Sequence, residues 1–343
     1  MQTTPNELEI APIEETGTLG VLHLKRFWSR TLACRAGRAQ PAGEECADTV
    51  LLCGLHAGIH EALSFVAQGS PSFERFEAWI LEINGGSLDP ARVARINAAL
   101  TGTLSPGMAP AAGSPDAALS AEDLEKWERD GYVVVRDAVT PDQCRAAAQA
   151  IYERMGADPA DPETWYQNPR GHSIWVPLLR HPAFQANRES PRIHAAYAQL
   201  WGRTDLWASV DQGGFNPPER PNWRFPGPHL HWDVSIAQPV PLGMSGILYL
   251  TDTEAAQGAF QCVPGFHRRL ASWLGELPPG SNPRDRRWME TLPAVPIAGQ
   301  AGDLVIWHQA LPHGSSPNRT TKPRVAQYIR MQPSRWDVHP VWL

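Results

Sequence analysis

Residues 20–102 carry apolar residues at intervals of three and four, which is the spacing of one buried helix face. Several of the expected helices also have end signals. Asp89 suits an N-cap with Pro90 in the first turn, and Gly85 suits a helix end. The pattern predicts a small helical unit, with helices inside the ranges 20–37, 47–69, 71–85 and 88–102.

The stretch at 101–119, TGTLSPGMAPAAGSPDAAL, is rich in Gly, Ala, Pro and Ser. This composition favours a linker over packed structure. We therefore expect a helical accessory domain over residues 1–115 and a second domain over residues 116–343.

The second domain is expected to open with a helix, a strand and another helix. Ser120 suits an N-cap with Asp123 three residues later, GYVVV at 131–135 is rich in β-formers, and Thr140 with Pro141 suits a helix start. From about residue 205 the pattern changes to short runs separated by Gly and Pro, which favours a β-sandwich or barrel. The predicted fold class is mainly β with flanking helices. The expected strands are LWASV (206–210), HLHWDVS (229–235), GMSGILYL (243–250), GAFQCV (258–263), DLVIWH (303–308) and RVAQYIRM (324–331).

Composition narrows the function classes. The 343 residues include 30 Lys and Arg and 36 Asp and Glu, a formal net charge of -6, without a basic block, so a nucleic-acid partner is not expected. The first residues lack the pattern of a secretory signal, and no apolar run reaches the roughly 18 residues of a membrane helix. We therefore expect a cytoplasmic protein without a membrane partner. The five cysteines form no CxxC pair, which favours reduced thiols over a disulfide framework.

The candidate chemistry lies in PGPHLHWDVS, residues 226–235. If this segment is extended, His229, His231 and Asp233 point the same way, because alternate residues of a strand share a face. His231 and Asp233 form an H-x-D pair, and the next histidine in a similar β context is His313. Two imidazoles and one carboxylate on one face of an octahedral ion leave three positions open, as in non-haem Fe(II) oxygenases. A 2-oxo acid can take two of these positions and dioxygen the third.

An arginine follows at a spacing that suits a cosubstrate. Arg324 begins a predicted strand eleven residues after His313, so it can cross one hairpin and lie beside the metal. Its planar guanidinium can hold a carboxylate through two parallel hydrogen bonds. Because a buried guanidinium without an acid is costly, we expect an anionic partner for Arg324.

Other histidines and tryptophans have two interpretations each. His229 and His308 can line a pocket or end a loop or strand, and a hydrogen-bonded loop histidine is the more typical role for His229. His56 and His60 lie one turn apart on an expected helix, a spacing that can bind metal, but without a third ligand a surface or core pair is favoured. Tryptophans in loop-like sequence can wall an apolar pocket, and these are Trp165, Trp175, Trp223 and Trp288.

From about residue 119 to 335 the chain resembles the phytanoyl-CoA dioxygenase-like branch of the Fe(II)/2-oxoglutarate oxygenases. The resemblance lies in an ordered series of segments: LEKWERDGYVVVRDAVTPDQC, HWD, GILYLTDTEAAQGAFQCVPGFHR and GDLVIWHQALPHGSSPNRTTKPR. It implies a double-stranded β-helix core of jelly-roll or cupin type, with Fe(II), 2-oxoglutarate as cosubstrate, and O2. Residues 1–115 lie outside it.

The same resemblance implies roles for single residues. His231, Asp233 and His313 would be the catalytic iron ligands. Arg324 with Ser315 would hold the distal carboxylate of 2-oxoglutarate.

It also suggests looser contacts. Tyr249 matches a position where the family often contacts the cosubstrate, and Trp232 matches one where a cosubstrate-lining side chain is common. A core tryptophan on the opposite strand face is an equal alternative for Trp232. Phe266 replaces the usual serine in PGFH, so His267 is expected to be a turn residue. Asp233 is intact, which disfavours halogenation because halogenating relatives replace this acid with a small residue.

We therefore expect a 2-oxoglutarate-dependent dioxygenase that oxidises, by default hydroxylates, an unactivated C–H bond and releases succinate and CO2. The expected substrate is a small-molecule metabolite or natural-product intermediate, and its attachment to CoA or a carrier is left open. A homodimer through the N-terminal helices is a further expectation. Two other classes stay open: a non-catalytic binding barrel of the same fold, which would be expected to have lost a ligand, and a zinc hydrolase, which would not need Arg324.

Overall fold

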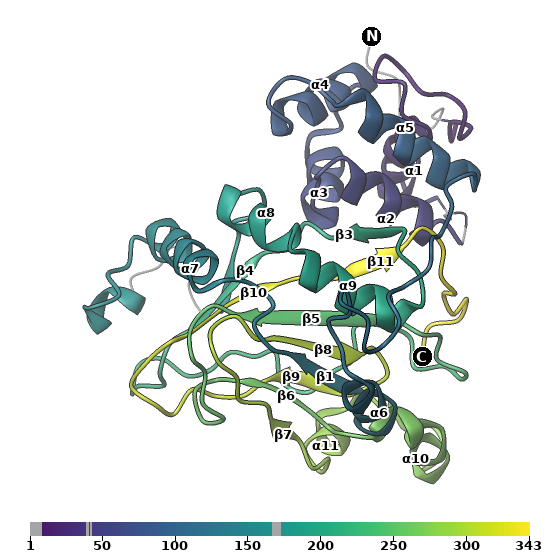
Figure 1. The fold of residues 1–343 in the computed structure, drawn as a ribbon. Coiled ribbons are helices and arrows are strands. Elements are labelled where there is room, and N and C mark those ends of the chain that lie inside the picture. Colours follow the sequence, from purple (N-terminus) through teal and green to yellow (C-terminus); the bar gives the residue numbers. More distant parts are fainter. Residues whose placement is uncertain (1–8, 39–40, 42, 167–172) are drawn as a thin grey trace. The chain divides into compact units, whose positions relative to one another are not determined.

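The computed structural model describes residues 9–38, 41, 43–166 and 173–343 (Figure 1). The chain divides into two compact units. Unit 1 comprises Met1–Met108, Arg203–Val210 and Gln332–Pro340, and unit 2 comprises Ala109–Gly202, Asp211–Met331 and Val341–Leu343.

This division differs from the predicted domains. The expected boundary near residue 115 assigned everything after it to one domain, whereas residues 203–210 and 332–340 join the N-terminal helices. The difference arises from pairing between segments far apart in sequence, because β3 (Leu206–Ala208) pairs with β11 (Met331–Pro333). Local hydrophobic patterns carry no information on such pairing.

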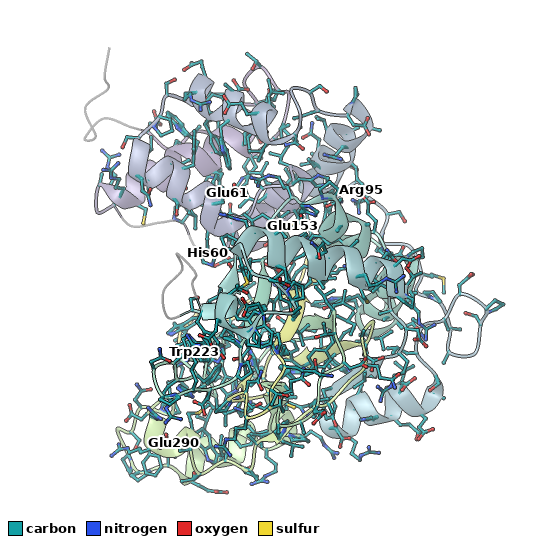
Figure 2. All side chains as sticks on the ribbon, turned by 90° about the vertical axis from the view of Figure 1, so that its left-hand side faces the viewer. His60, Glu61, Arg95, Glu153, Trp223 and Glu290 are labelled. Carbon is teal, nitrogen blue, oxygen red and sulfur yellow. The ribbon has the colours of Figure 1, made fainter. Side chains whose placement is uncertain are left out.

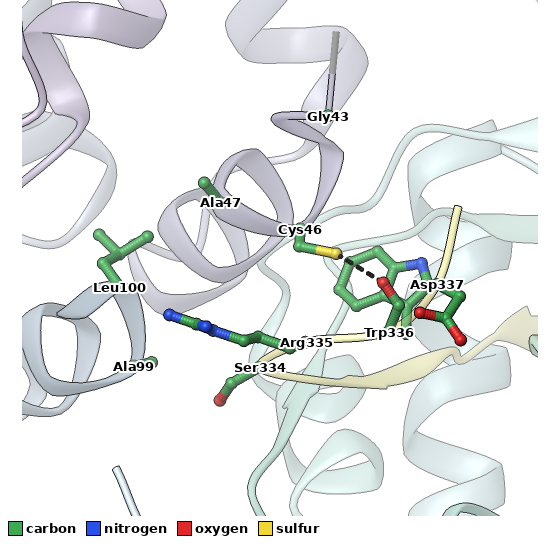
Figure 3. A pocket seen from close by; sticks show the side chains of 9 residues that line it. All are labelled: Gly43, Cys46, Ala47, Ala99, Leu100, Ser334, Arg335, Trp336 and Asp337. Carbon is green, nitrogen blue, oxygen red and sulfur yellow. Dashed lines mark hydrogen bonds between the residues drawn. The ribbon is translucent and has the colours of Figure 1, made fainter. Parts of the chain in front are cut away.

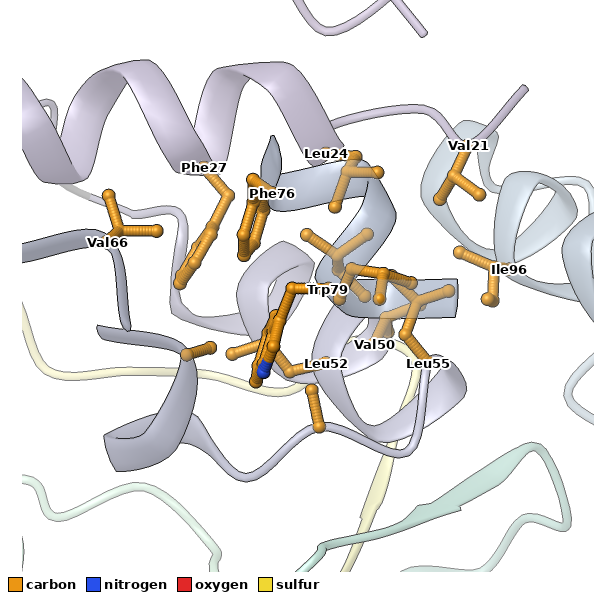
Figure 4. Close-up of a cluster of buried hydrophobic side chains, with 14 of the residues drawn as sticks. Val21, Leu24, Phe27, Val50, Leu52, Leu55, Val66, Phe76, Trp79 and Ile96 are labelled. Atoms are coloured by element: carbon orange, nitrogen blue, oxygen red, sulfur yellow. The ribbon is translucent and has the colours of Figure 1, made fainter. Parts of the chain in front are cut away.

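The helices described in unit 1 pack around one apolar core (Figure 4). At its centre, the rings of Phe76 and Trp79 stack with centroids 5.7 Å apart, and Phe65 stacks on Trp79 at 4.6 Å. Trp207 of β3 joins the same core. The helices are α1 (Leu24–Arg35), α2 (Glu45–Gly54), α3 (Ile59–Gly69), α4 (Phe73–Ile83) and α5 (Pro90–Thr101).

The helix ends follow their sequence signals in most places. Asp89 caps α5 by accepting a hydrogen bond from the Ala91 N–H, as predicted. The expected helix within 47–69 is instead two helices, so the prediction that His56 and His60 share a helix is wrong. His56 lies between α2 and α3 with φ of 52°, a left-handed conformation that ends a helix, and His60 lies on α3 (Figure 2).

A pocket of about 560 Å³ lies within unit 1 (Figure 3). It is lined by residues of α2 and α5 and by Ser334–Asp337. The Cys46 thiol donates a hydrogen bond to the Trp336 carbonyl at 3.3 Å, and burial raises the pKa of this thiol. Residues 334–337 thus form one wall of a pocket in the helical unit.

In the described residues, no single helix is long and apolar enough to span a membrane. The bent pair α2 and α3 meets these criteria only when the two helices, 97° apart, are taken together.

Unit 2 contains two antiparallel sheets with helices beside them. The larger sheet has the order β1-β8-β5-β10-β4-β2, and the smaller has the order β7-β6-β9. The strands are β1 (Tyr132–Val135), β2 (Trp175–Val176), β4 (Gly213–Asn216), β5 (Met244–Tyr249), β6 (Phe260–Cys262), β7 (Val295–Pro296), β8 (Leu304–His308), β9 (His313–Ser315) and β10 (Arg324–Tyr328). The helices are α6 (Ala121–Asp130), α7 (Pro141–Met155), α8 (Pro182–Arg188), α9 (Pro191–Trp201), α10 (Leu270–Glu276) and α11 (Arg286–Met289), with short 3-10 turns at Pro162–Tyr166 and Phe266–Arg268.

The two sheets of unit 2 face each other across a shared core. Phe260 of the small sheet and Trp307 of the large sheet have ring centroids only 4.4 Å apart. Strands that alternate buried side chains toward such an interior are what a jelly roll requires. The predicted double-stranded β-helix core with flanking helices is confirmed.

The strand β10 shows how the fold separates its two faces. Ala326 lies in the core between the sheets, whereas Gln327 accepts a hydrogen bond from Asn187 of α8 at 2.8 Å. Since alternate residues of a strand share a face, Arg324 and Tyr328 lie on the same side as Ala326.

Most expected strands are present, including those at 131–135, 243–250 and 303–308. The expected strand HLHWDVS is not. Within 229–235 only His231 makes a ladder contact, an isolated antiparallel bridge to His313.

Candidate metal and cosubstrate site

The backbone brings His231 and His313 together. The His231 N–H donates to the His313 carbonyl at 2.9 Å, and the His313 N–H donates to the His231 carbonyl at 3.0 Å. Directly opposed residues of an antiparallel pair have neighbouring side chains. The two imidazole centroids are accordingly 4.7 Å apart.

Asp233 completes the predicted triad. Its Oδ1 lies 3.1 Å from His231 Nε2, and its Oδ2 lies 3.2 Å from His313 Nε2. One ligand atom from each of the three residues lies within 4.8 Å of the others. The triad is open on one side, because the Asp233 side chain is 57% exposed while that of His313 is 6% exposed.

The Nδ1 atoms of both histidines already have hydrogen-bond partners on the backbone. His231 Nδ1 lies 2.8 Å from the His229 carbonyl, and His313 Nδ1 lies 3.1 Å from the Leu311 carbonyl. A carbonyl oxygen can only accept, so each Nδ1 carries a proton, and a neutral ring in this orientation offers its Nε2 lone pair to an ion beside Asp233. Two nitrogen lone pairs and a carboxylate converge favourably only around a cation. This donor set fits a divalent metal ion with open coordination positions.

The electrostatics of the triad agree with that reading. Burial alone would raise the pKa of Asp233, but when the two imidazoles donate from Nε2 in the absence of an ion, their hydrogen bonds outweigh burial and hold the pKa of Asp233 well below its usual range. Burial would lower the pKa of His231, and the Asp233 carboxylate outweighs burial and raises it. The arrangement of His231, Asp233 and His313 therefore favours an ionised Asp233 beside a positive charge.

Arg324 is a fully buried cation. Its Nη2 donates to the Ser315 hydroxyl at 3.2 Å and its Nη1 to the Tyr328 hydroxyl at 3.5 Å, while its buried Nε finds no hydrogen-bond partner among the residues that the structure describes. Among the described residues, no carboxylate pairs with it. A buried guanidinium left without an acid fits a site that receives a carboxylate from a ligand.

Two residues around Arg324 were missed from the sequence. Tyr328 lies four positions after Arg324, on the same face of β10, and its ring packs on Trp175 with centroids 4.7 Å apart. Gly214 lies on the neighbouring strand, where an added Cβ would approach Arg324 Nη1 to 3.2 Å. Alternation along RVAQY is the signal that could have found Tyr328, whereas the role of Gly214 needs the pairing of β10 with β4.

The structure does not bring Trp232 and Tyr249 into contact with the triad or the guanidinium through a hydrogen bond. The Trp232 indole donates to the Ala310 carbonyl at 2.9 Å and packs on Phe266 and Trp273, which is the core alternative left open above. The Tyr249 hydroxyl donates to the Ile297 carbonyl at 2.7 Å and accepts from the Phe260 N–H at 3.0 Å.

The remaining histidines divide between loop and turn positions. His229 is exposed, and its ring meets Phe225 edge-on at 5.5 Å. The His308 Nδ1 accepts from the Ala310 N–H at 3.0 Å, so this side chain ends β8. Its ring lies 5.3 Å from that of His267, which follows the Gly265 turn.

An apolar cluster lies between His229 and Tyr328. Ile174, Trp223 and Phe225 are buried together, with Tyr166 and Trp175 packed against them (Figure 2 labels Trp223). Phe225 contacts His229 at one end and Trp175 contacts Tyr328 at the other. Of the four tryptophans expected in loops, Trp175 and Trp223 therefore belong to this cluster. Trp165 instead donates to the Asp158 carbonyl, and the Trp288 indole nitrogen is buried without a partner.

The sequence profile of the phytanoyl-CoA dioxygenase (PhyH) family matches residues 127–326, more than half of the chain. The chain belongs to the phytanoyl-CoA dioxygenase family. This family comprises Fe(II)- and 2-oxoglutarate-dependent enzymes that use O2, so the predicted family, enzyme class and cofactors are confirmed.

Individual relatives of this family are distant from the chain. A putative phytanoyl-CoA dioxygenase of Dictyostelium discoideum is 23% identical over 261 residues, covering 61% of this chain and 74% of the relative. An ectoine dioxygenase of Bordetella parapertussis is 24% identical over 256 residues, covering 65% and 80%. Among solved structures, EctD from S. alaskensis with bound Fe has 20% identity and a TM-score of 0.48, covering 68% and 84%.

Proposed function

We propose that His231, Asp233 and His313 hold Fe(II) and that Arg324 anchors the distal carboxylate of 2-oxoglutarate, with help from the Ser315 and Tyr328 hydroxyls. The enzyme then oxidises, by default hydroxylates, an unactivated C–H bond of a small-molecule metabolite or natural-product intermediate. The observation that carries this proposal is the presence in unit 2 of two complementary features: three donor side chains that suit a divalent cation, and a buried guanidinium that pairs with no carboxylate of the described residues.

When bound, Fe(II) with 2-oxoglutarate and O2 supplies the oxidant for the C–H bond, with release of succinate and CO2. The protein contributes orientation. The carbonyls of His229 and Leu311 fix the two rings so that both Nε2 atoms would face a bound ion. Arg324 presents its fork from a rigid strand in the middle of the large sheet, which fixes where a carboxylate can lie.

The apolar cluster around Trp223 supports an apolar portion in the substrate, because it extends between His229 and Tyr328. A small-molecule substrate also agrees with the name of the ectoine dioxygenase relative. Attachment of the substrate to CoA or a carrier, a homodimer through the N-terminal helices and a cytoplasmic location stay predictions.

The direct test is anaerobic mixing of the purified protein with Fe(II) and 2-oxoglutarate. A weak visible charge-transfer band is expected for the protein, and His231→Ala should lose it. Succinate release on admission of O2 separates a dioxygenase from a non-catalytic barrel of the same fold. Absence of the band in the unmodified protein would contradict the proposal, and hydrolysis unaffected by 2-oxoglutarate would favour a zinc enzyme.

A further inference from the structure

The backbone around Asp233 is held by an arginine outside the ligand set. Arg284 lies in the loop between α10 and α11. Its Nη1 donates to the Trp232 carbonyl at 2.7 Å and its Nη2 to the Val234 carbonyl at 2.5 Å. These carbonyls flank Asp233 on both sides. One rigid guanidinium therefore fixes the chain before and after the proposed ligand.

The same guanidinium holds the segment Val341–Leu343. Its Nε and Nη2 donate to the Leu343 carbonyl at 3.1 and 2.8 Å, and its Cζ lies 4.9 Å from the Trp342 ring centroid. Ser235 makes a second attachment, because its hydroxyl donates to the Val341 carbonyl at 2.7 Å and accepts from the Leu343 N–H at 3.1 Å. We call Arg284 with this segment the Arg284 clasp.

Asp233 needs such support more than the histidines do. His231 and His313 fix each other through two backbone hydrogen bonds. Asp233 lies two residues beyond that bridge, in a bend rather than a strand, and its side chain is 57% exposed. Within the described residues, its side-chain hydrogen bonds are those with the two histidines. The Arg284 clasp holds the backbone on both sides of this carboxylate.

We propose that Arg284 is a positioning residue of the metal site and that residues 341–343 act through it. The inference rests on the proposed function, since it takes the triad as the metal ligands. Partners of this kind, which orient a ligand without touching the ion, change metal affinity by about 10- to 100-fold when removed.

The first test is titration of the metal-free protein with Co(II) alone, with Arg284→Met compared with Arg287→Met. Arg287 is a neighbouring arginine that is 64% exposed and pairs with Asp285 at 3.4 Å, so it controls for loss of a charge. We expect Arg284→Met to weaken Co(II) binding by about 10- to 100-fold and Arg287→Met to leave it unchanged. Arg284→Lys should remain weakened, because an ammonium cannot span three carbonyls as the planar fork does.

The second test uses Trp342→Ala, which alters an exposed side chain and keeps the fold testable if Arg284→Met does not accumulate. Loss of an exposed cation–π contact should weaken Co(II) binding by about two- to five-fold. In the double variant with Arg284→Met, Trp342→Ala should add little, since both changes remove one clasp.

The outcomes separate the two proposals. Co(II) binding by Arg284→Met equal to that of the unmodified protein would overturn the clasp alone, whatever the change in thermal stability. Failure of the unmodified protein to bind Co(II) would overturn the proposed function, and the clasp with it.

Discussion

Two groups of histidine and carboxylate side chains in the described residues lie within ligand distance, and they differ in what balances the negative charge. In unit 1, His23 Nε2 lies 2.9 Å from Asp48 Oδ1, and Glu44 is close by. Arg26 donates to Glu44 at 2.6 Å, and Arg30 pairs with both Glu44 and Asp48. Two guanidiniums thus neutralise two carboxylates in this arginine-paired cluster.

In unit 2, among the described residues, no arginine forms a salt bridge with Asp233: Arg284 lies near it but donates to backbone carbonyls. The Asp233 oxygens face the two imidazoles, while the buried Arg324 donates to hydroxyls and its Nε has no hydrogen-bond partner within the described part of the chain. The comparison teaches that residue types alone do not make a metal site. Carboxylates already satisfied by arginine gain little from a cation, whereas a carboxylate facing two imidazole lone pairs gains much.

The largest expected effect is on metal content. Asp233→Ala should reduce bound Fe(II) from one ion per chain to none and abolish succinate formation, because two neutral imidazoles alone hold the ion weakly. Asp48→Asn, in the arginine-paired cluster, is the matched control and should keep the ion. Elemental analysis after dialysis checks both variants. An ion retained by Asp233→Ala and lost by Asp48→Asn would reverse the comparison.

The next effect is on stability and has different outcomes in the two regions. Arg30→Met should lower the free energy of unfolding of the metal-free protein by about 1.5–3 kcal/mol, because it removes a guanidinium that hydrogen-bonds two charged groups, leaving Glu44 to Arg26 and Asp48 to His23. Arg324→Met should change it by less than about 1 kcal/mol or raise it, since a buried charge without an acid is removed. Denaturant unfolding measures both, and equal losses would show that pairing does not distinguish the arginines.

A smaller effect concerns the cosubstrate. Arg324→Gln should leave Fe(II) content unchanged and weaken 2-oxoglutarate binding about 100-fold, which corresponds to roughly 2.7 kcal/mol. Arg319→Gln, at an exposed position five residues earlier, should leave binding unchanged. Titration of the charge-transfer band with 2-oxoglutarate provides the measurement. Unchanged affinity in Arg324→Gln would place the carboxylate elsewhere.

The smallest effect concerns His308, whose pKa is lowered by burial and by the neighbouring His267. Burial lowers the pKa of His308 to about 4, whereas the neighbouring Asp233 reverses the effect of burial at His231. Between pH about 6.5 and 4 the unfolded chain binds a proton at residue 308 that the folded chain does not. Stability should therefore fall as pH falls through this window, by about 2 kcal/mol between pH 6.5 and 5.

His308→Asn is the control for this pH dependence. An Asn oxygen can still accept from the Ala310 N–H but does not titrate. Thermal unfolding of the metal-free protein at pH 7, 6 and 5 should show a shallower decline for His308→Asn. Identical declines would assign the pH dependence to other groups.

The sequence predicted the features that depend on nearby residues. The cap at Asp89, the capping box at Ser120 and the strand that begins at Arg324 depend on local sequence, and the structure contains them. The approach of His231, Asp233 and His313 was predicted from spacing and resemblance, and these side chains do converge.

The features that were missed depend on tertiary pairing. Gly214 and Arg284 act on residues far away in the sequence, so no local pattern marks them. Residues 332–340 join the helical unit for the same reason. The H-x-D segment was expected as a strand, but only His231 finds a ladder partner there, and the Trp232 ring turns into the core.

The close approach of Gly314 to the His229 carbonyl limits which mutations the site tolerates. A Cβ at position 314 would lie 2.5 Å from that oxygen, the same oxygen that receives the Nδ1 proton of His231. Even an alanine would push this acceptor aside and free the imidazole to adopt its other tautomer, with the proton on the nitrogen that faces the ion. A residue without a side chain thus protects the ligand chemistry of its neighbours, and libraries aimed at new substrates should leave it unaltered.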